Sequence, residues 1–275
     1  MSTNPPGKTR ALALVAAAGL SLVAYAYLNP PLADPGLPVS LPVIGALPGD
    51  LPTYAWRFLL SFFVLGALPL AAALALGERP ASLGLTRPKP LSPRWAFPLL
   101  LGVVILGALV GAYNSSIFAY YPYTRTLTEG RPGGAGGFLL HAVFYVVLYY
   151  LPWEVLFRGI LVFPMLRLVG DPAAAGRGLA SERGLAANSA LRRRAAEGGL
   201  RPAALLTVAC LQALPSTLLH YGHPWSETLM ALPFGLVLGW LALAAGSLLP
   251  GLALHAAAGL FLDLFILLRR AGGLP

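Results

Sequence analysis

Two ionisable side chains of this protein stand one helical turn apart inside an apolar stretch. Glu154 and Arg158 lie within residues 138–168, where nearly all neighbours are apolar. A charged side chain at the centre of a bilayer costs roughly 2.5 to 3.5 kcal/mol on insertion scales, so an acid and a base need a reason to be there. Their i, i+4 spacing puts both on one helix face, where they can neutralise each other. The pair is either a buried structural ion pair or one wall of an active site.

A second group of ionisable residues lies toward the C-terminus: His220, His223, Glu227, His255 and Asp263. His255 and Asp263 fall broadly on one side of a helix, and Gly259 between them leaves room for a water or a substrate backbone. Each of these residues alone is compatible with a structural contact, because polar side chains in lipid usually face the bundle interior. As a set with Glu154, they are numerous enough to carry acid–base chemistry.

Two kinds of chemistry fit these residue types. A carboxylate and a histidine can take a proton from water and return it to a leaving amine, as peptide hydrolysis requires. Alternatively, His220, His255 and Glu154 could be ligands of a divalent metal such as zinc, which in catalytic sites has three protein ligands and one open position. The His-x-x-His spacing that ends at His223, next to Gly and Pro, is weak support for zinc. Metal binding therefore stays an open alternative.

The composition indicates a membrane protein. Of the 275 residues, 57% are hydrophobic and 11% are charged, with a mean hydropathy of +0.72, whereas soluble domains carry about 25% charged residues. We expect an all-α, polytopic membrane bundle of about seven (six to eight) transmembrane helices. The net charge of +9 is typical of cytoplasmic loops, so no nucleic-acid partner is predicted. The single cysteine, Cys210, excludes an intramolecular disulfide and any multi-cysteine metal site.

Apolar segments are expected to span the membrane at residues 11–28, 54–76, 95–113, 138–168, 202–219, 229–245 and 248–268. The charges of loop 29–53 are all acidic, whereas basic residues dominate 78–94, which predicts a multi-pass protein with a cytoplasmic N-terminus. Scarce lysine and abundant Ala, Gly, Leu and Pro suggest a GC-rich bacterial source and hence the inner (plasma) membrane. Seven spans would leave Arg269 and Arg270 outside, so either one segment is re-entrant or the charge rule fails at this end.

Two parts of the chain are predicted from these patterns. Residues 1–94 form an N-terminal transmembrane hairpin with a cytoplasmic loop, and residues 95–275 form the membrane core. The core contains an Arg-rich insertion at 170–201, with Arg192, Arg193 and Arg194 in a row. Its composition cannot build a core, so we expect a solvated cytoplasmic loop, with or without an amphipathic helix against anionic headgroups.

Three motifs in order resemble those of the CPBP intramembrane proteases, which include type II CAAX prenyl endopeptidases and bacteriocin-processing or immunity proteins. The family motifs E-E-x-x-x-R-G, F-x-x-x-H and H-x-x-x-N correspond here to Trp153-Glu154-Val-Leu-Phe-Arg158-Gly159, Ser216-Thr-Leu-Leu-His220 and His255-Ala-Ala-Ala-Gly259. The approach Gly246-Ser-Leu-Leu-Pro-Gly-Leu-Ala-Leu-His255 and the segment Leu83-Gly-Leu-Thr-Arg-Pro are also similar to the family. The resemblance covers residues 80–268.

This resemblance implies an endopeptidase that cleaves a peptide or the tail of a membrane-associated protein. In the family, the first Glu and the second-motif His activate a water, and the third-motif His and Asn stabilise the oxyanion. By position, His220 would help to activate the water and His255 would face the oxyanion. Trp153 cannot act as a base and Gly259 offers no side-chain donor, so Glu154 or Glu227 is expected to take the missing role.

The resemblance makes Glu154, His220 and His255 the candidate catalytic residues, supported by Arg158, His223, Glu227, Gly259 and Asp263. The expected partners are a peptide or protein-tail substrate and the lipid bilayer. Two other functions remain open: a family member that has lost catalysis and binds or regulates a membrane partner, and a transporter lined by the same residues. Against a transporter, the sequence contains no recognisable internal repeat.

Overall fold

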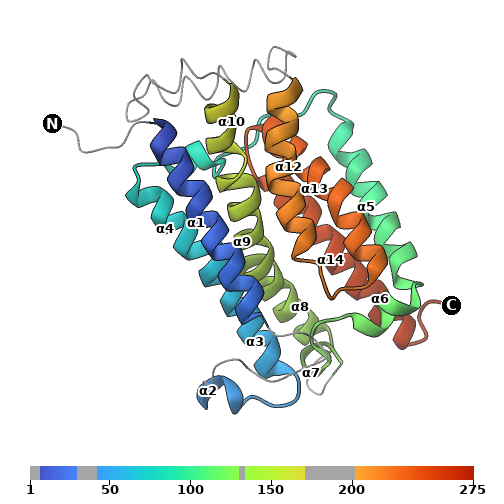
Figure 1. Ribbon diagram of the computed structural model, residues 1–275. Helices are drawn as coiled ribbons and strands as arrows, with labels where there is room; N and C mark the ends of the chain where they lie inside the picture. The colour runs from blue at the N-terminus through green and yellow to red at the C-terminus, as the bar shows by residue number, and fades with distance from the viewer. Residues whose placement is uncertain (1–6, 30–41, 130–133, 171–201) are drawn as a thin grey trace.

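The computed structural model describes residues 7–29, 42–129, 134–170 and 202–275, and over these residues the chain contains helices and no strand (Figure 1). Helices long and apolar enough to cross a membrane lie at Thr9–Leu28, Leu51–Ala75, Gly134–Leu166, Trp225–Ala245 and Leu249–Arg270. Two shorter apolar helices lie at Ala96–Ala112 and Leu206–Leu218. The predicted all-α, polytopic membrane bundle is therefore confirmed in the described part of the chain.

The N-terminal half consists of one long helix and several shorter elements, of which the three within Leu51–Ala75 form one continuous helix. They are α1 (Gly7–Leu28), α2 (Pro42–Gly45), α3 (Leu51–Leu60), the π-helical turn η1 (Ser61–Ala67), α4 (Leu68–Ala75), the 3₁₀ turn η2 (Pro80–Leu83), α5 (Ala96–Ala112), α6 (Ser115–Tyr120) and α7 (Arg125–Thr128). The first long segment that follows consists of α8 (Gly134–Phe144), the π-helical turn η3 (Tyr145–Tyr150), α9 (Leu151–Glu154), the π-helical turn η4 (Val155–Ile160) and α10 (Phe163–Gly170). The chain then continues through α12 (Pro202–Leu218), α13 (Trp225–Ala245) and α14 (Leu249–Arg270).

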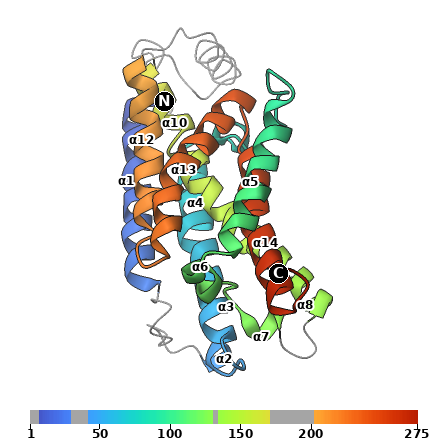
Figure 2. The ribbon, with the colours of Figure 1, turned by 90° about the vertical axis from the view of Figure 1, so that its right-hand side faces the viewer.

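The segment from α8 to α10 runs through the middle of the bundle. Helices α1, α3 and α4 pack on one side of it, and α12, α13 and α14 pack on the other, with α5 along α14 (Figure 1). Figure 2 shows the same packing from the side. The first turn of α1 and the last turn of α10 lie at the same end of the bundle, and the C-terminus lies at the other end (Figure 1). The central segment, which carries Glu154, is thus enclosed by helices from both halves of the chain.

Prolines account for the wide π-helical turns η3 and η4 on either side of Glu154, and for η1 in the N-terminal half. The residue four positions before Pro69, Pro152 or Pro164 falls inside η1, η3 or η4, respectively. A proline ring crowds the carbonyl four residues earlier and cannot donate to it, and a wider turn relieves that contact. After η4, the Leu161 N–H donates to the carbonyl of Leu156, five residues back, at 3.0 Å. Glu154 and Arg158 therefore lie on a helix of irregular pitch, and π-helical turns are frequent at functional sites.

A short segment outside the C-terminal half closes over the turn between α13 and α14. The Leu248 N–H donates to the Gly84 carbonyl, and the Ser247 hydroxyl donates to the Thr86 carbonyl. Gly84 has a φ of 81°, and a Cβ atom there would lie 2.0 Å from the ring of Phe163. Only glycine fits this backbone and this contact. The segment that resembles the family ahead of its core thus packs directly on that core.

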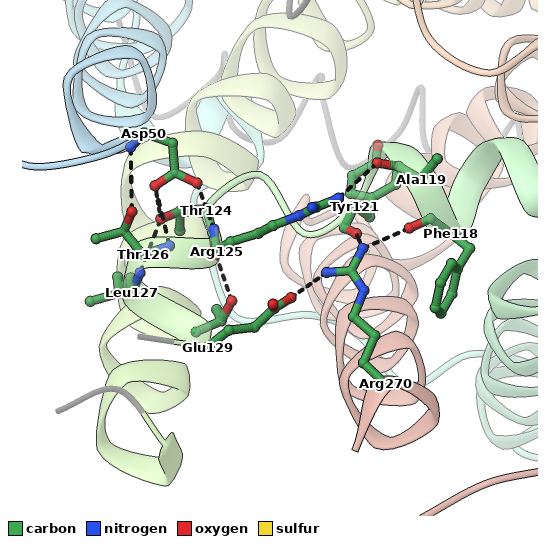
Figure 3. A network of polar contacts seen from close by, with 11 residues as sticks. Asp50, Phe118, Ala119, Tyr121, Thr124, Arg125, Thr126, Leu127, Glu129 and Arg270 are labelled. Carbon is green, nitrogen blue, oxygen red and sulfur yellow. Dashed lines mark hydrogen bonds and ion pairs between the residues drawn. The ribbon is translucent and has the colours of Figure 1, made fainter. Parts of the chain in front are cut away.

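Polar contacts join the loops at the C-terminal end of the bundle (Figure 3). The Asp50 carboxylate accepts hydrogen bonds from the Thr124 hydroxyl and from the N–H groups of Arg125 and Thr126, which caps α7. Burial raises the pKa of Asp50, but the hydrogen bonds from Thr126, Arg125 and Thr124 lower it more, so the pKa lies below its ordinary value. Asp50 therefore stays charged and holds α7 against the start of α3.

The basic C-terminal end of α14 is held by local partners. Arg269 donates to the Ala112 carbonyl at 2.5 Å, and its guanidinium lies over the rings of Tyr113 and Phe118. Arg270 donates to the carbonyls of Phe118 and Tyr121 and forms an ion pair with Glu129 (Figure 3). Both arginines at the end of α14 therefore have partners within the protein. The Arg-rich insertion predicted at 170–201 lies outside the described residues, apart from Gly170.

Candidate active site

Glu154 and His255 meet at the centre of the bundle although 101 positions separate them in the chain. Glu154 ends α9 and is fully buried, and its Oε1 lies 2.9 Å from Nδ1 of His255 on α14. The same oxygen lies 3.2 Å from Nη1 of Arg158, one turn further along the central helix. A carboxylate oxygen only accepts, so Nδ1 of His255 donates. Glu154 thus holds both a histidine and a guanidinium through one oxygen.

The second carboxylate oxygen of Glu154 is buried without a hydrogen-bond partner among the described residues. A Cβ atom built on Gly251 would lie 3.0 Å from this Oε2. Gly251 therefore makes room for the carboxylate one turn before His255 on α14. A buried, unpaired carboxylate oxygen is costly in a structural ion pair, and it is available to accept from a water or a substrate.

His220 lies in the turn after α12 and presents one free ring nitrogen. Its Nδ1 lies 2.8 Å from the carbonyl of Ser216 and must donate to it, which leaves Nε2 of the neutral ring as an acceptor. Burial, followed by the neighbouring His223, lowers the pKa of His220 to about 4, although Glu227 opposes the shift. The ring is therefore neutral at physiological pH and can accept a proton.

His223, Glu227 and Tyr121 form a hydrogen-bonded group next to His220. Nδ1 of His223 lies 3.0 Å from Oε1 of Glu227, and the Tyr121 hydroxyl donates to the same oxygen at 2.7 Å. The rings of His220 and His223 have centroids 5.2 Å apart. Tyr121 is itself held by Arg270 through its carbonyl. Glu227 is thus engaged in orienting His223, and the sequence contains no motif that marks Tyr121 as part of this group.

Trp153 occupies the position of the first family glutamate and forms a wall between Glu154 and the N-terminal helix. It is buried, and its ring lies edge-on to Tyr25 of α1 with centroids 6.1 Å apart. The ring of His220 lies on it with a centroid distance of 5.6 Å. The indole N–H has no hydrogen-bond partner among the described residues. Trp153 therefore packs against His220 without offering a base.

Asp263 does not join the candidate site. Its Oδ2 lies 2.9 Å from Nε2 of His141 on α8, and the Tyr54 hydroxyl lies 3.0 Å from the other nitrogen of that ring. All three side chains are buried. A neutral His141 satisfies both contacts by donating to Asp263 and accepting from Tyr54. This group links α3, α8 and α14, and the i, i+8 spacing from His255 carries Asp263 away from Glu154.

Gly259 lies against Tyr150, a residue that no sequence motif marks. A Cβ atom on Gly259 would lie 1.7 Å from the Tyr150 hydroxyl oxygen, so a side chain at 259 and this hydroxyl exclude each other. The ring of Tyr150 packs on His255 with centroids 4.5 Å apart. The structure therefore places His255 in contact with both Tyr150 and Glu154, whereas His220 contacts Trp153, the residue before Glu154.

The donor set does not fit a zinc site as arranged. Among the described residues, no group of three or more His, Cys, Asp or Glu side chains lies close enough to hold a metal ion. Nδ1 of His220 and Nδ1 of His255 are hydrogen-bonded to Ser216 and Glu154, so only Nε2 of each ring could bind a metal. An apolar pocket of about 340 Å³ is lined by Val162 and by residues of α12 and α13, has Gln212 as its polar side chain, and does not include Glu154, His220 or His255.

Comparison with known proteins gives one match. Residues 135–261 match the family model described as type II CAAX prenyl endopeptidase Rce1-like. This stretch contains Glu154, Arg158, His220 and His255 and ends two residues before Asp263. No curated protein and no solved structure matches the chain.

Proposed function

This chain belongs to the CPBP family through its type II CAAX prenyl endopeptidase Rce1-like segment, residues 135–261, and from that premise we propose that it is an intramembrane endopeptidase. The substrate class is a peptide or the tail of a membrane-associated protein. The observation that carries the proposal is the buried contact of 2.9 Å between Glu154 and His255, because it joins two of the family's motifs around one carboxylate with a free oxygen.

The chemistry follows from the free atoms of the site. The water proton passes to Nε2 of His220, which is unprotonated because Nδ1 donates to Ser216. The same nitrogen then returns the proton to the leaving amine. Glu154 fixes the orientation of His255 through Nδ1 and offers Oε2 to the attacking water. Arg158 holds the carboxylate in place through the contact between Nη1 and Oε1.

Replacing His220 should remove most of the activity and change its pH dependence. His220→Ala loses the proton acceptor, so we expect kcat to fall by about 10²- to 10⁴-fold. Wild-type activity should be retained at neutral pH and fall as the pH drops through about 4, the lowered pKa of His220, since the protonated ring cannot accept. Purified protein in lipid nanodiscs is incubated with prenylated and unprenylated peptide libraries, and products are identified by mass spectrometry.

Tyr221→Phe serves as the control, because Tyr221 neighbours His220 but is 92% exposed. It should cleave at the wild-type rate. Equal rates for wild type and His220→Ala, or an acid limb near pH 6.5, the ordinary pKa of histidine, would contradict the role of His220. A comparison of the two libraries tests whether a prenyl group is recognised.

The residues at positions 153 and 158 favour a second function. In it, the protein has lost catalysis and binds a membrane partner. Trp153 fills the position of the first family glutamate with a buried ring, and Arg158 neutralises Glu154. Absence of cleavage by the wild-type protein from every library would support this alternative.

For the orientation in the membrane, we propose that the N-terminus and residues 170–201 share the cytoplasmic side. The basic residues of 78–94 and 170–201 support this, as does the common end at which α1 begins and α10 ends. Reporter fusions at Gly36 and Gly176 should give opposite signals in cells. Equal signals from the two sites would reject this topology.

A further inference from the structure

A glutamate in the first turn of α13, Glu227, is held in place by two donors close to His220. Its Oε1 accepts from the Tyr121 hydroxyl at 2.7 Å and from Nδ1 of His223 at 3.0 Å. Its Oε2 is buried and has no hydrogen-bond partner among the described residues. Tyr121 is fixed in turn by Arg270, which donates to its carbonyl at 2.8 Å (Figure 3). The carboxylate of Glu227 therefore has a defined position.

The start of α13 also fixes His220. The His220 carbonyl accepts from the Thr228 hydroxyl at 2.9 Å and from the His223 N–H at 3.0 Å. The ring of His223 has its centroid 5.2 Å from that of His220, and the same ring is hydrogen-bonded to Glu227. The imidazole of His220 thus packs on a side chain that is one hydrogen bond away from a carboxylate.

The two glutamates of the candidate site differ in the charges around them. Oε1 of Glu154 lies 3.2 Å from the Arg158 guanidinium, which balances its charge. In the described part of the chain, Glu227 contacts His223 and no Lys or Arg side chain. When His220 takes a proton from water, its ring becomes a cation, and a nearby negative charge stabilises this form. The charge of Glu227 is available for this purpose.

We propose that Glu227, positioned by Tyr121 and His223, supplies the negative charge that stabilises His220 while this ring carries the proton of the attacking water. The inference rests on the proposed function and adds a positioning residue to it, because Glu227 acts through His220. In the first step, a water O–H bond breaks, the proton goes to Nε2 of His220, and the water oxygen bonds to the carbonyl carbon. In the second, the C–N bond breaks and the proton moves from Nε2 to the leaving amine. Glu227 stays ionised throughout.

The test is Glu227→Gln, which keeps the size of the side chain and an acceptor for Tyr121 but removes the charge. Outer partners of a functional histidine contribute about 10- to 100-fold in metal sites, and we expect kcat at neutral pH to fall by this factor. Burial and then His223 lower the pKa of His220 to about 4, with a smaller contribution from His255, and Glu227 opposes them. Without Glu227, the acid limb of the activity should therefore move to a pH below that of the wild type.

His223→Gln should move the acid limb in the opposite direction. It removes the neighbour that, after burial, lowers the pKa of His220 most. The glutamine can still donate to Glu227. The pH at which kcat is half its maximal value should therefore rise from about 4 toward 6.5, the ordinary pKa of histidine. A residue that only packs against His220 would shift this pH in neither variant.

Three further variants serve as controls. Thr228→Val removes a hydrogen bond to the His220 carbonyl but no charge, so kcat should fall by about 2- to 10-fold, the usual contribution of one hydrogen bond, with the acid limb unmoved. Glu227→Asp keeps the charge and should also keep the acid limb near pH 4. Glu129→Gln makes the same replacement in an acid that pairs with Arg270 and should match the wild type. Thermal melting in nanodiscs checks that each variant is folded.

The outcomes separate this inference from the proposed function. An acid limb of Glu227→Gln at the wild-type pH, or a kcat within twofold of the wild type, overturns the role of Glu227. A Thr228→Val variant whose acid limb moves as far as that of Glu227→Gln overturns it too, because no charge is lost. If His220→Ala is inactive in these cases, the endopeptidase proposal stands alone. If the wild-type protein cleaves none of the peptides, both proposals fail.

Discussion

Glu154→Gln should reduce peptide cleavage by about 10³-fold or more. The amide has nearly the same size and can still accept from His255, but it lacks the charge that holds Arg158 and favours proton uptake from water. Losing the carboxylate that orients a catalytic histidine costs about 10⁴-fold in a well-studied serine protease, where the geometry is otherwise intact. The measurement is kcat on the best peptide of the library, in lipid nanodiscs.

Glu129→Gln is the matched control for this change. It makes the same replacement in a residue that pairs with Arg270 at the C-terminal end of the bundle, away from His255 (Figure 3). It should cleave within about twofold of the wild type, because a partly exposed ion pair contributes little. If Glu154→Gln were as active as Glu129→Gln, Glu154 would be a structural acid and the endopeptidase mechanism would fail.

Arg158→Leu should destabilise the folded protein by about 3 to 5 kcal/mol, because it leaves the Glu154 carboxylate buried with its countercharge removed. Both side chains are almost completely enclosed, at 1% and 0% exposure, so solvent cannot compensate for the loss. Leucine fills part of the space but neutralises nothing. The decrease should be measured as a lower unfolding temperature and a lower yield of monodisperse protein.

Adding Glu154→Gln to Arg158→Leu should recover part of this loss. The neutral amide no longer needs a cation, so the double variant is expected to be more stable than Arg158→Leu alone. The four proteins form a double-mutant cycle. A coupling near zero would show that the two side chains do not stabilise each other, and the i, i+4 contact would then contribute nothing to the fold.

The sequence alone determined the class of the protein and the face on which Glu154 and Arg158 meet. Apolar composition has no alternative to a helical membrane bundle when strands are not indicated, and the i, i+4 spacing is a local geometry that any helix produces. The ion pair of 3.2 Å follows from this spacing. The sequence also identified His220 and His255 as candidates, because polar residues are few in apolar segments.

Only the tertiary structure decided which of the named residues share a site. Which residue of α14 meets Glu154 depends on the axial position and the rotation of α14 against the central helix, and side-chain packing along the whole bundle sets both. In the structure His255 contacts Glu154, and Asp263, about two turns further along α14, contacts His141. The position of Tyr150 was hidden for a related reason: its partner is a glycine, which has no side chain to suggest a contact. The turns η3 and η4, which follow from prolines four residues further along the chain, set the direction of the side chains of α9 between them, including Glu154.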